Sequence, residues 1–155
     1  TDERRPIETG PAKQRAPGHF VVRPSRPLIA DKNDVLAAIG KTNACTVNAL
    51  SPEIHRGEGP SPYGRPGHIK GSVNVPGSAL IDPATNRFIA PAAIERLFHD
   101  AGVLDREKVI TYCGGGITAT ATAFALALIG QPDPKVYDGS LGEWAPDASL
   151  PVELG

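Results

Sequence analysis

Residues 113–118, with the sequence CGGGIT, combine a thiol with a flexible, uncharged loop. Cys113 follows the apolar stretch KVITY (108–112), three glycines come next, and a helical pattern begins at Ile117. Unpaired N–H groups at a helix N-terminus, together with glycine N–H groups that no side chain shields, favour a thiolate over a thiol. Thr118 in the first helical turn can add a hydroxyl donor. The spacing therefore predicts a nucleophilic cysteine held by backbone donors.

The cysteine and the glycines after it also allow interpretations other than a nucleophile. A buried structural cysteine beside a glycine turn is a common arrangement, and Cys45, which lies inside a predicted strand without a glycine loop, is best explained that way. The run GGGITA (114–119) also matches the dinucleotide pattern G-x-G-x-x-A. That motif should follow the first strand of the fold, whereas this loop comes late in the chain. A phosphate-binding P-loop is excluded because no Gly-Lys-Ser/Thr follows.

The length and composition fit one ordinary domain. A reduced compartment is the default expectation for a chain with two cysteines. The chain has 155 residues and a net charge of −1, which gives no electrostatic reason to expect nucleic acid or an anionic membrane as partner. Two cysteines do not suggest a disulfide framework, and no Cys and His group has metal-ligand spacing. We expect a cytoplasmic protein without metal or cofactor. The absence of methionine indicates processing or a fragment of a longer chain.

The chain divides near residue 30. Residues 1–30 are predicted to be an N-terminal extension or inter-domain linker that ends in a short strand at HFVV (19–22). Its first 27 residues carry a net charge of +3, scattered and mixed, which indicates a solvated linker rather than a polyanion-binding arm. Residues 31–155 are predicted to be one domain.

Strand and helix patterns alternate within that domain. Strands are predicted at 44–50, 73–76, 108–112 and 135–140, and helices at 31–39, 91–102 and 117–129, with shorter helical turns at 52–55 and near 141–146. Such alternation predicts an α/β fold with a mostly parallel sheet covered by helices on both faces. Ligands of these sheets bind at the carboxyl ends of the strands, where Cys113 lies.

Three motifs in order resemble the rhodanese-type sulfurtransferases: GRPGHIKGSVNVP (64–76), YCGGGITATATAFALALIG (112–130) and VYDGSLGEW (136–144). The resemblance covers Asp31 to Glu153 and implies a rhodanese-like domain with a central, mostly parallel five-stranded sheet. It implies that Cys113 accepts a sulfane sulfur as a persulfide. The residues that would form the cradle around that sulfur are Gly114, Gly115, Gly116, Ile117, Thr118 and Ala119.

The resemblance also implies a larger protein and a choice of substrate. The first 30 residues resemble the linker of two-domain members, so the chain would be the C-terminal catalytic half, with an N-terminal rhodanese-like domain as its partner. The related phosphatases use C-x5-R, and here the arginine position is Ala119, which argues against phosphate chemistry. The loop carries no basic residue, which favours 3-mercaptopyruvate over thiosulfate as sulfur donor.

Departures from the family pattern affect the anion site. A D-x-R pattern is usual on the second strand, but this chain has Asn48 to Leu50, and the usual substrate-binding arginine falls at Ile54. Arg65 and Arg56 remain as candidates to bind a donor carboxylate through two parallel hydrogen bonds.

Several other residues of the family motifs are given structural roles. His68 is expected to hydrogen-bond within its loop. The last motif is expected to brace the strand end beside the cysteine, with Trp144 buried and its N–H bonded; its members are Asp138, Ser140, Glu143 and Trp144.

These observations predict a double displacement at Cys113, in which sulfur passes from a small-molecule donor to a thiol or cyanide acceptor. The alternative is a non-catalytic rhodanese-like module for docking or regulation, for which the altered NAL strand would be the sign. The intact cysteine loop argues for the enzyme.

Overall fold

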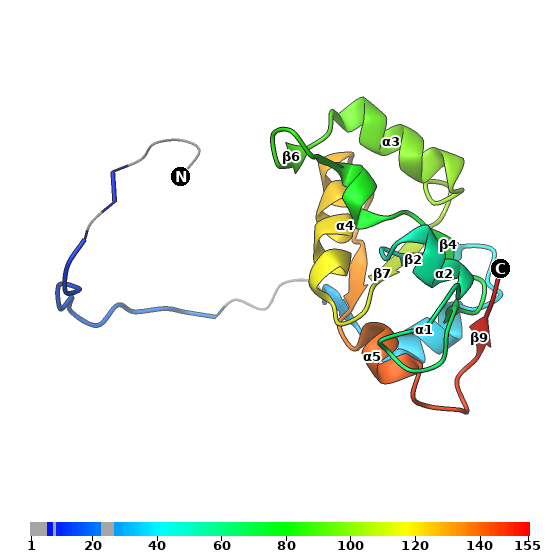
Figure 1. Ribbon diagram of the computed structural model, residues 1–155. Coiled ribbons are helices and arrows are strands. Elements are labelled where there is room, and N and C mark those ends of the chain that lie inside the picture. The colour runs from blue at the N-terminus through cyan, green and yellow to red at the C-terminus, as the bar shows by residue number, and fades with distance from the viewer. Residues whose placement is uncertain (1–5, 8, 23–26) are drawn as a thin grey trace.

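The computed structural model describes residues 6, 7, 9–22 and 27–155. The rest of the predicted extension, residues 1–5, 8 and 23–26, lies outside the described residues. Residues 9–22 run away from the domain without forming a helix or strand (Figure 1). The strand predicted at HFVV is therefore wrong: Phe20, Val21 and Val22 are 85%, 61% and 74% exposed, and no neighbouring strand pairs with them.

A five-stranded sheet forms the centre of the domain, as predicted. Its order is β1-β8-β7-β2-β4, and all four neighbouring pairs are parallel. The bounds of the five strands are Ile29–Ala30 for β1, Ala44–Asn48 for β2, Val73–Asn74 for β4, Lys108–Tyr112 for β7 and Lys135–Tyr137 for β8. β2 and β7 form the longest ladder, from the pair Ala44 and Lys108 to the pair Asn48 and Tyr112.

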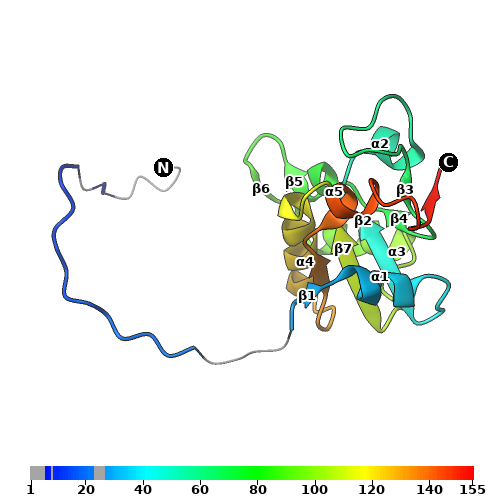
Figure 2. The ribbon, with the colours of Figure 1, turned by 90° about the horizontal axis from the view of Figure 1, so that it is seen from below.

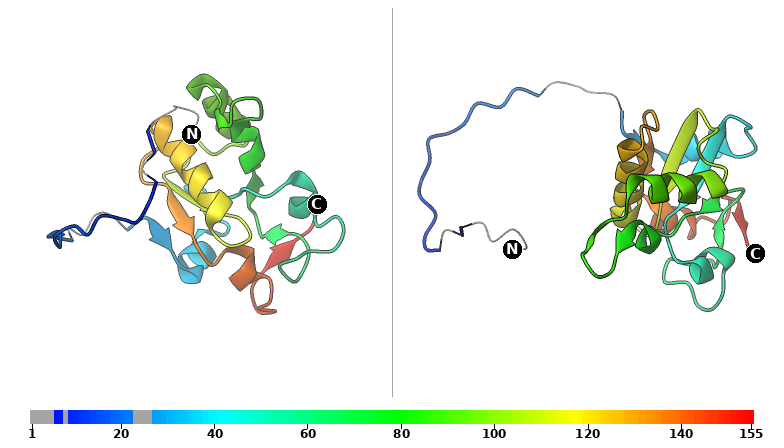
Figure 3. Two further views of the ribbon diagram at one scale, coloured as in Figure 1. Left: turned by 60° about the vertical axis from the view of Figure 1, so that its left-hand side comes forward. Right: turned by 90° about the horizontal axis from the view of Figure 1, so that it is seen from above.

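Helices cover both faces of this sheet (Figures 2 and 3). Helices α1 (Lys32–Ala38) and α5 (Ser140–Trp144) pack on one face, where Val35, Leu141 and Trp144 share a core with strand side chains. Helices α3 (Pro91–Asp100) and α4 (Ile117–Leu128) pack on the other face through residues such as Phe98 and Leu126. These two apolar cores enclose the sheet and hold the strand ends in place.

Local signals explain where the helices begin. The carboxylate of Asp31 accepts hydrogen bonds from the N–H groups of Asn33 and Asp34, and the Asp34 carboxylate accepts one from the N–H of Asp31, which makes a capping box for α1. Pro91 occupies the first turn of α3, where a missing N–H costs nothing. Gly116, with φ of 82°, precedes α4.

Short elements complete the domain. Helix α2 (Pro52–Arg56) follows β2, and a 3₁₀ helix η1 (Gly77–Leu80) follows β4. Two antiparallel pairs of two-residue strands lie outside the main sheet. They are β3 (His68–Ile69) with β9 (Val152–Glu153), and β5 (Ile81–Asp82) with β6 (Arg87–Phe88).

Candidate active site

Cys113 lies directly after β7, at the carboxyl edge of the sheet. Side chains alternate along the strand, so Ile110 and Tyr112 enter the core beneath α1 and α5, while Val109 and Cys113 point to the side of α4. The thiol-bearing residue is 3% exposed and packs with Ala119 and Ala123 of α4. The strand period and the position of α4 therefore place the cysteine beneath the first turn of that helix.

Ser140 anchors the cysteine loop. Its Oγ accepts hydrogen bonds from the N–H groups of Cys113 and Gly116, each at 3.1 Å, and donates one to the carbonyl of Tyr137 at 2.8 Å. Ser140 is fully buried and has φ of 50°, which is uncommon for a residue other than glycine. One hydroxyl thus ties the two ends of the loop 113–116 to the end of β8, the bracing role expected for this residue.

The first turn of α5 holds the same loop from its carbonyl side. The N–H of Leu141 donates to the carbonyl of Cys113 at 3.0 Å, and the N–H of Gly142 donates to that of Gly114 at 2.8 Å. A Cβ on Gly142 would lie 3.0 Å from the Gly114 oxygen, so glycine permits this close approach. Trp144 is buried and its indole N–H donates to Pro151, as predicted.

The remaining backbone donors lie at the start of α4. Within the described chain, no side chain caps this helix, so the N–H groups of Ile117, Thr118 and Ala119 remain for an anionic atom. The N–H of Gly116 donates to Ser140, and the place of Gly116 in the cradle stays a prediction. Ile117 is 86% exposed at the rim of the loop, and Thr118 packs its methyl group beside Gly77.

Two loop glycines are needed because other residues approach them closely. A Cβ on Gly116 would lie 2.4 Å from Oδ1 of Asp138. A Cβ on Gly114 would lie 2.2 to 2.3 Å from the phenol end of Tyr63. Tyr63 was missed by the sequence analysis because it lies in a Pro- and Gly-rich stretch without periodicity, 50 residues before the cysteine.

Arg65 is bonded within the protein, and its predicted contact with substrate stays a prediction. Its Nε donates to the carbonyl of Ala145 at 2.8 Å, and its Nη2 donates to those of Asp147 at 2.6 Å and Leu150 at 2.9 Å. The guanidinium therefore binds the segment after α5 through Nε and Nη2, which gives Arg65 a structural role. These bonds leave Nη1 for any contact with a substrate.

Arg56 is also paired within the protein. Its Nε and Nη2 donate to the two carboxylate oxygens of Glu58 at 2.7 and 3.1 Å, on the exposed side of α2. The hydrogen bond that Arg56 donates to Glu58, together with the negative charge of Glu58, raises the pKa of Arg56, against a smaller opposing effect of desolvation. The two parallel bonds expected with a substrate carboxylate are made with Glu58 instead, so the structure gives no support to a substrate contact by Arg56.

Asn48, the last residue of β2, contacts the neutral side chain of His55 and not a charged group. The Leu50 N–H donates to Oδ1 of Asn48, so the Asn48 amide nitrogen faces Nδ1 of His55, at 3.1 Å, and Nδ1 must accept. Burial lowers the pKa of His55 to about 4, with smaller contributions from His68 and Arg56. His68 stacks on His55 at 3.8 Å and bonds its backbone carbonyl, in agreement with the structural role expected for His68.

Cys45 provides the contrast to Cys113. It lies inside β2, is 7% exposed, and its Sγ contacts the carbonyl of Thr46 at 3.6 Å. Burial raises the pKa of the Cys45 thiol to about 11, although Arg106 opposes this effect. The structural role expected for Cys45 agrees with these surroundings.

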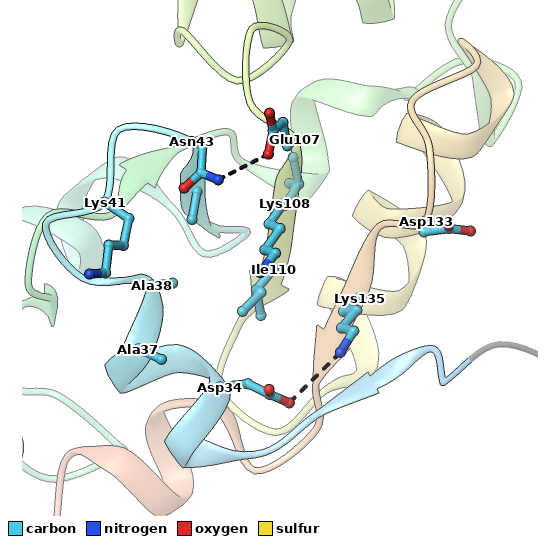
Figure 4. Close-up of a pocket in the computed structure, with 12 residues that line it drawn as sticks. Asp34, Ala37, Ala38, Lys41, Asn43, Glu107, Lys108, Ile110, Asp133 and Lys135 are labelled. Carbon is cyan, nitrogen blue, oxygen red and sulfur yellow. Dashed lines mark hydrogen bonds and ion pairs between the residues drawn. The ribbon is translucent and has the colours of Figure 1, made fainter.

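A cavity of about 550 Å³ lies at the opposite edge of the sheet (Figure 4). It is lined by residues at the amino ends of β2, β7 and β8, including Ala44, Lys108 and Lys135, and Asp34 pairs with Lys135 at 3.9 Å. Among the described residues, no cysteine, serine or histidine lines it. The chemistry of the loop 113–119 is thus separate from this cavity.

No cluster of three or more His, Cys, Asp or Glu residues is arranged to hold a metal ion within the described part of the chain. No helix among the residues that the structure describes is long and apolar enough to span a membrane.

Comparison with known proteins identifies the family. Residues 55–147 match the family described as "Rhodanese-like domain". The chain is 38% identical over 117 residues to "Putative thiosulfate sulfurtransferase SseB" of Mycobacterium tuberculosis, which covers 75% of this chain and 40% of that protein. It is 33% identical over 133 residues to 3-mercaptopyruvate sulfurtransferase of Escherichia coli, and this aligned region covers 86% of this chain and 44% of that protein. The chain belongs to the rhodanese-like family.

Solved structures agree on the fold. The anaerobic ergothioneine biosynthesis enzyme of Chlorobium limicola superposes with a TM-score of 0.76 at 23% identity, over 85% of this chain and 33% of that one. The Tum1 protein of Saccharomyces cerevisiae gives 0.69 at 25% identity, over 81% of this chain and 46% of that one. The chain spans about half, or less, of each relative named here.

Proposed function

We propose that the protein is a sulfurtransferase that carries sulfur as a persulfide on Cys113. The observation that carries this proposal is the position of the thiol between the end of β7 and the uncapped first turn of α4. There the N–H groups of Ile117, Thr118 and Ala119 can stabilise a negative sulfur. The loop is held in this shape by Ser140 and α5, so its donors are oriented before a substrate arrives.

The reaction is a double displacement. The Cys113 thiolate attacks the outer sulfur of the donor, an S–S bond forms, and the bond between that sulfur and its carrier breaks with its electron pair leaving on the carrier. Thiosulfate would release sulfite, and 3-mercaptopyruvate would release pyruvate after its carbon takes up the thiol proton. Cyanide or a thiol then attacks the outer sulfur and regenerates the Cys113 thiolate.

The uncharged loop favours 3-mercaptopyruvate as the donor over thiosulfate. From Gly114 to Ala119 the loop offers no cationic side chain to compensate a dianion, and a carboxylate with one charge costs less to desolvate. Relatives named for each of the two donors match this chain at similar identity. The donor preference is therefore part of the proposal, and kcat/KM measured with both compounds tests it.

We also propose that the full protein has a second domain and lies in the cytoplasm. Because the chain spans about 40% of the relatives named above, we propose an N-terminal rhodanese-like domain that faces the carboxyl edge of the sheet. Ile117 is exposed four residues after the buried Cys113, which supports a second domain that would cover this apolar side chain. Two unpaired thiols fit a reducing cytoplasm.

Mass spectrometry after incubation with donor tests the central claim. The peptide with Cys113 should gain the mass of one sulfur atom and lose it on addition of cyanide. Cys113→Ser should abolish turnover, whereas Cys45→Ser is the matched control and should retain it. A protein that stays unmodified with both donors would favour the docking or regulatory module.

A further inference from the structure

The side chain of Tyr63 lies against the cysteine loop. A Cβ on Gly114 would be 2.2 Å from Cζ and 2.3 Å from the hydroxyl oxygen of Tyr63, so the phenol end is in van der Waals contact with the backbone of Gly114. Gly114 is the residue next to Cys113, and neighbouring Cα atoms are about 3.8 Å apart. The body of the ring packs on the core beneath α5. Tyr63 is therefore held with its polar end beside the backbone of the residue that follows Cys113.

The hydroxyl of Tyr63 has an unused hydrogen bond. The hydroxyl groups of the two other tyrosines are bonded, Tyr112 to Ser72 at 2.6 Å and Tyr137 to Glu143 at 2.7 Å. Among the described residues none bonds the hydroxyl of Tyr63, whose only hydrogen bond is from its backbone N–H to Ser61. Buried side-chain N and O atoms in this part of the chain all have partners, so the Tyr63 hydroxyl is open to solvent.

The anionic group of the sulfur donor needs a hydrogen-bond partner such as this hydroxyl. Arg65 is bound to three carbonyls and Arg56 to Glu58, so the Nε and Nη2 groups of both arginines are already engaged within the protein. The loop from Gly114 to Ala119 has no cationic side chain. Tyr63 is a polar side chain from outside the loop that the structure places in contact with it and that still has a proton to donate.

We propose that Tyr63 determines donor specificity: its hydroxyl donates a hydrogen bond to the anionic group of the sulfur donor while the donor's sulfur is at Cys113. This inference rests on the proposed sulfurtransfer at Cys113. A single neutral hydroxyl suits a monoanionic organic donor, whose carboxylate needs less compensation than a dianion. The substrate class is therefore an organic thiol with one carboxylate.

The test separates the two half-reactions by rapid mixing. Tyr63→Phe keeps the ring on Gly114 and removes only the hydroxyl. Persulfide formation from 3-mercaptopyruvate should slow by about 10-fold, the usual effect of one hydrogen bond to a charged group, mainly through a higher KM. Removal of the sulfur by cyanide, which has no carboxylate, should keep the wild-type rate. The melting temperature should stay within a few degrees, since an exposed hydroxyl is lost.

Tyr137→Phe is the matched control, because it removes an identical hydroxyl that is bonded to Glu143 instead of facing the loop. It should leave the ratio of the two half-reactions as in the wild type. The specificity role is refuted if Tyr63→Phe forms persulfide at the wild-type rate, or if both half-reactions slow together, which would indicate loop distortion. If wild-type protein forms no persulfide at all, the proposed function itself fails, and this inference with it.

Discussion

Replacement of Ser140 by alanine tests how the loop is held. The change removes Oγ, the acceptor of two buried N–H groups and the donor to a buried carbonyl. A buried polar group without its partner costs about 1–3 kcal/mol, so the two N–H groups alone predict a loss of about 2–6 kcal/mol in the free energy of unfolding. In a domain of this size that corresponds to a fall in Tm of roughly 4–24 °C.

Urea unfolding followed by circular dichroism measures this loss. The exposed Ser78 is the control, because no side-chain hydrogen bond of it is found in the described structure and Ser78→Ala should change stability by less than about 0.5 kcal/mol. Ser140→Gly gives a second comparison. It also lacks the hydroxyl but accepts φ of 50° without strain, so it should be about 1 kcal/mol more stable than Ser140→Ala.

The same variants should react more slowly at Cys113, because the loop donors are no longer held in place. Persulfide formation measured by mass spectrometry should fall in both Ser140 variants and stay normal in the Ser78 control. An alanine variant within 0.5 kcal/mol of wild type would refute the reasoning, since it would mean that water or another group satisfies the two N–H groups.

Three further predictions follow from the contacts described above. Arg65→Lys should lower the free energy of unfolding by about 2–4 kcal/mol in urea titrations, because the compact ammonium of lysine does not reproduce the planar fork that reaches three separate carbonyls. Unchanged stability would contradict the structural role of Arg65. His55 should titrate by NMR near pH 4. The free energy of unfolding should fall as the pH drops from 6.5 toward 4, because His55 binds a proton in the unfolded chain over this range but stays neutral in the folded protein. A titration near pH 6.5 would contradict its buried, neutral state. Gly116→Ala should lower the melting temperature, because its Cβ meets Asp138 at 2.4 Å and its φ is 82°; Gly115→Ala, where a Cβ meets nothing within 4 Å, is the control and should melt within a few degrees of wild type.

Much of the fold follows from local sequence signals. The strand KVITY, the glycines after it and the helix from Ile117 are contiguous, so propensity and periodicity predict their order and place Cys113 at a strand end. The two-residue strands β1, β3 and β9 are too short to show a period, and they exist because a partner strand lies beside them. HFVV has the composition of a strand but no partner, and it forms none.

The sequence by itself determined the position of Cys113 between a strand and a helix, and the family motifs, because these depend on neighbours within a few residues. Only the tertiary structure decided what surrounds the thiol. Ser140 reaches the loop from 27 residues away, and the hydrogen bonds of Arg65 span 80 residues and more. Tyr63 lies on Gly114 because the fold returns a distant loop to the strand end. Such contacts depend on how the chain packs, which no local pattern of residue types encodes.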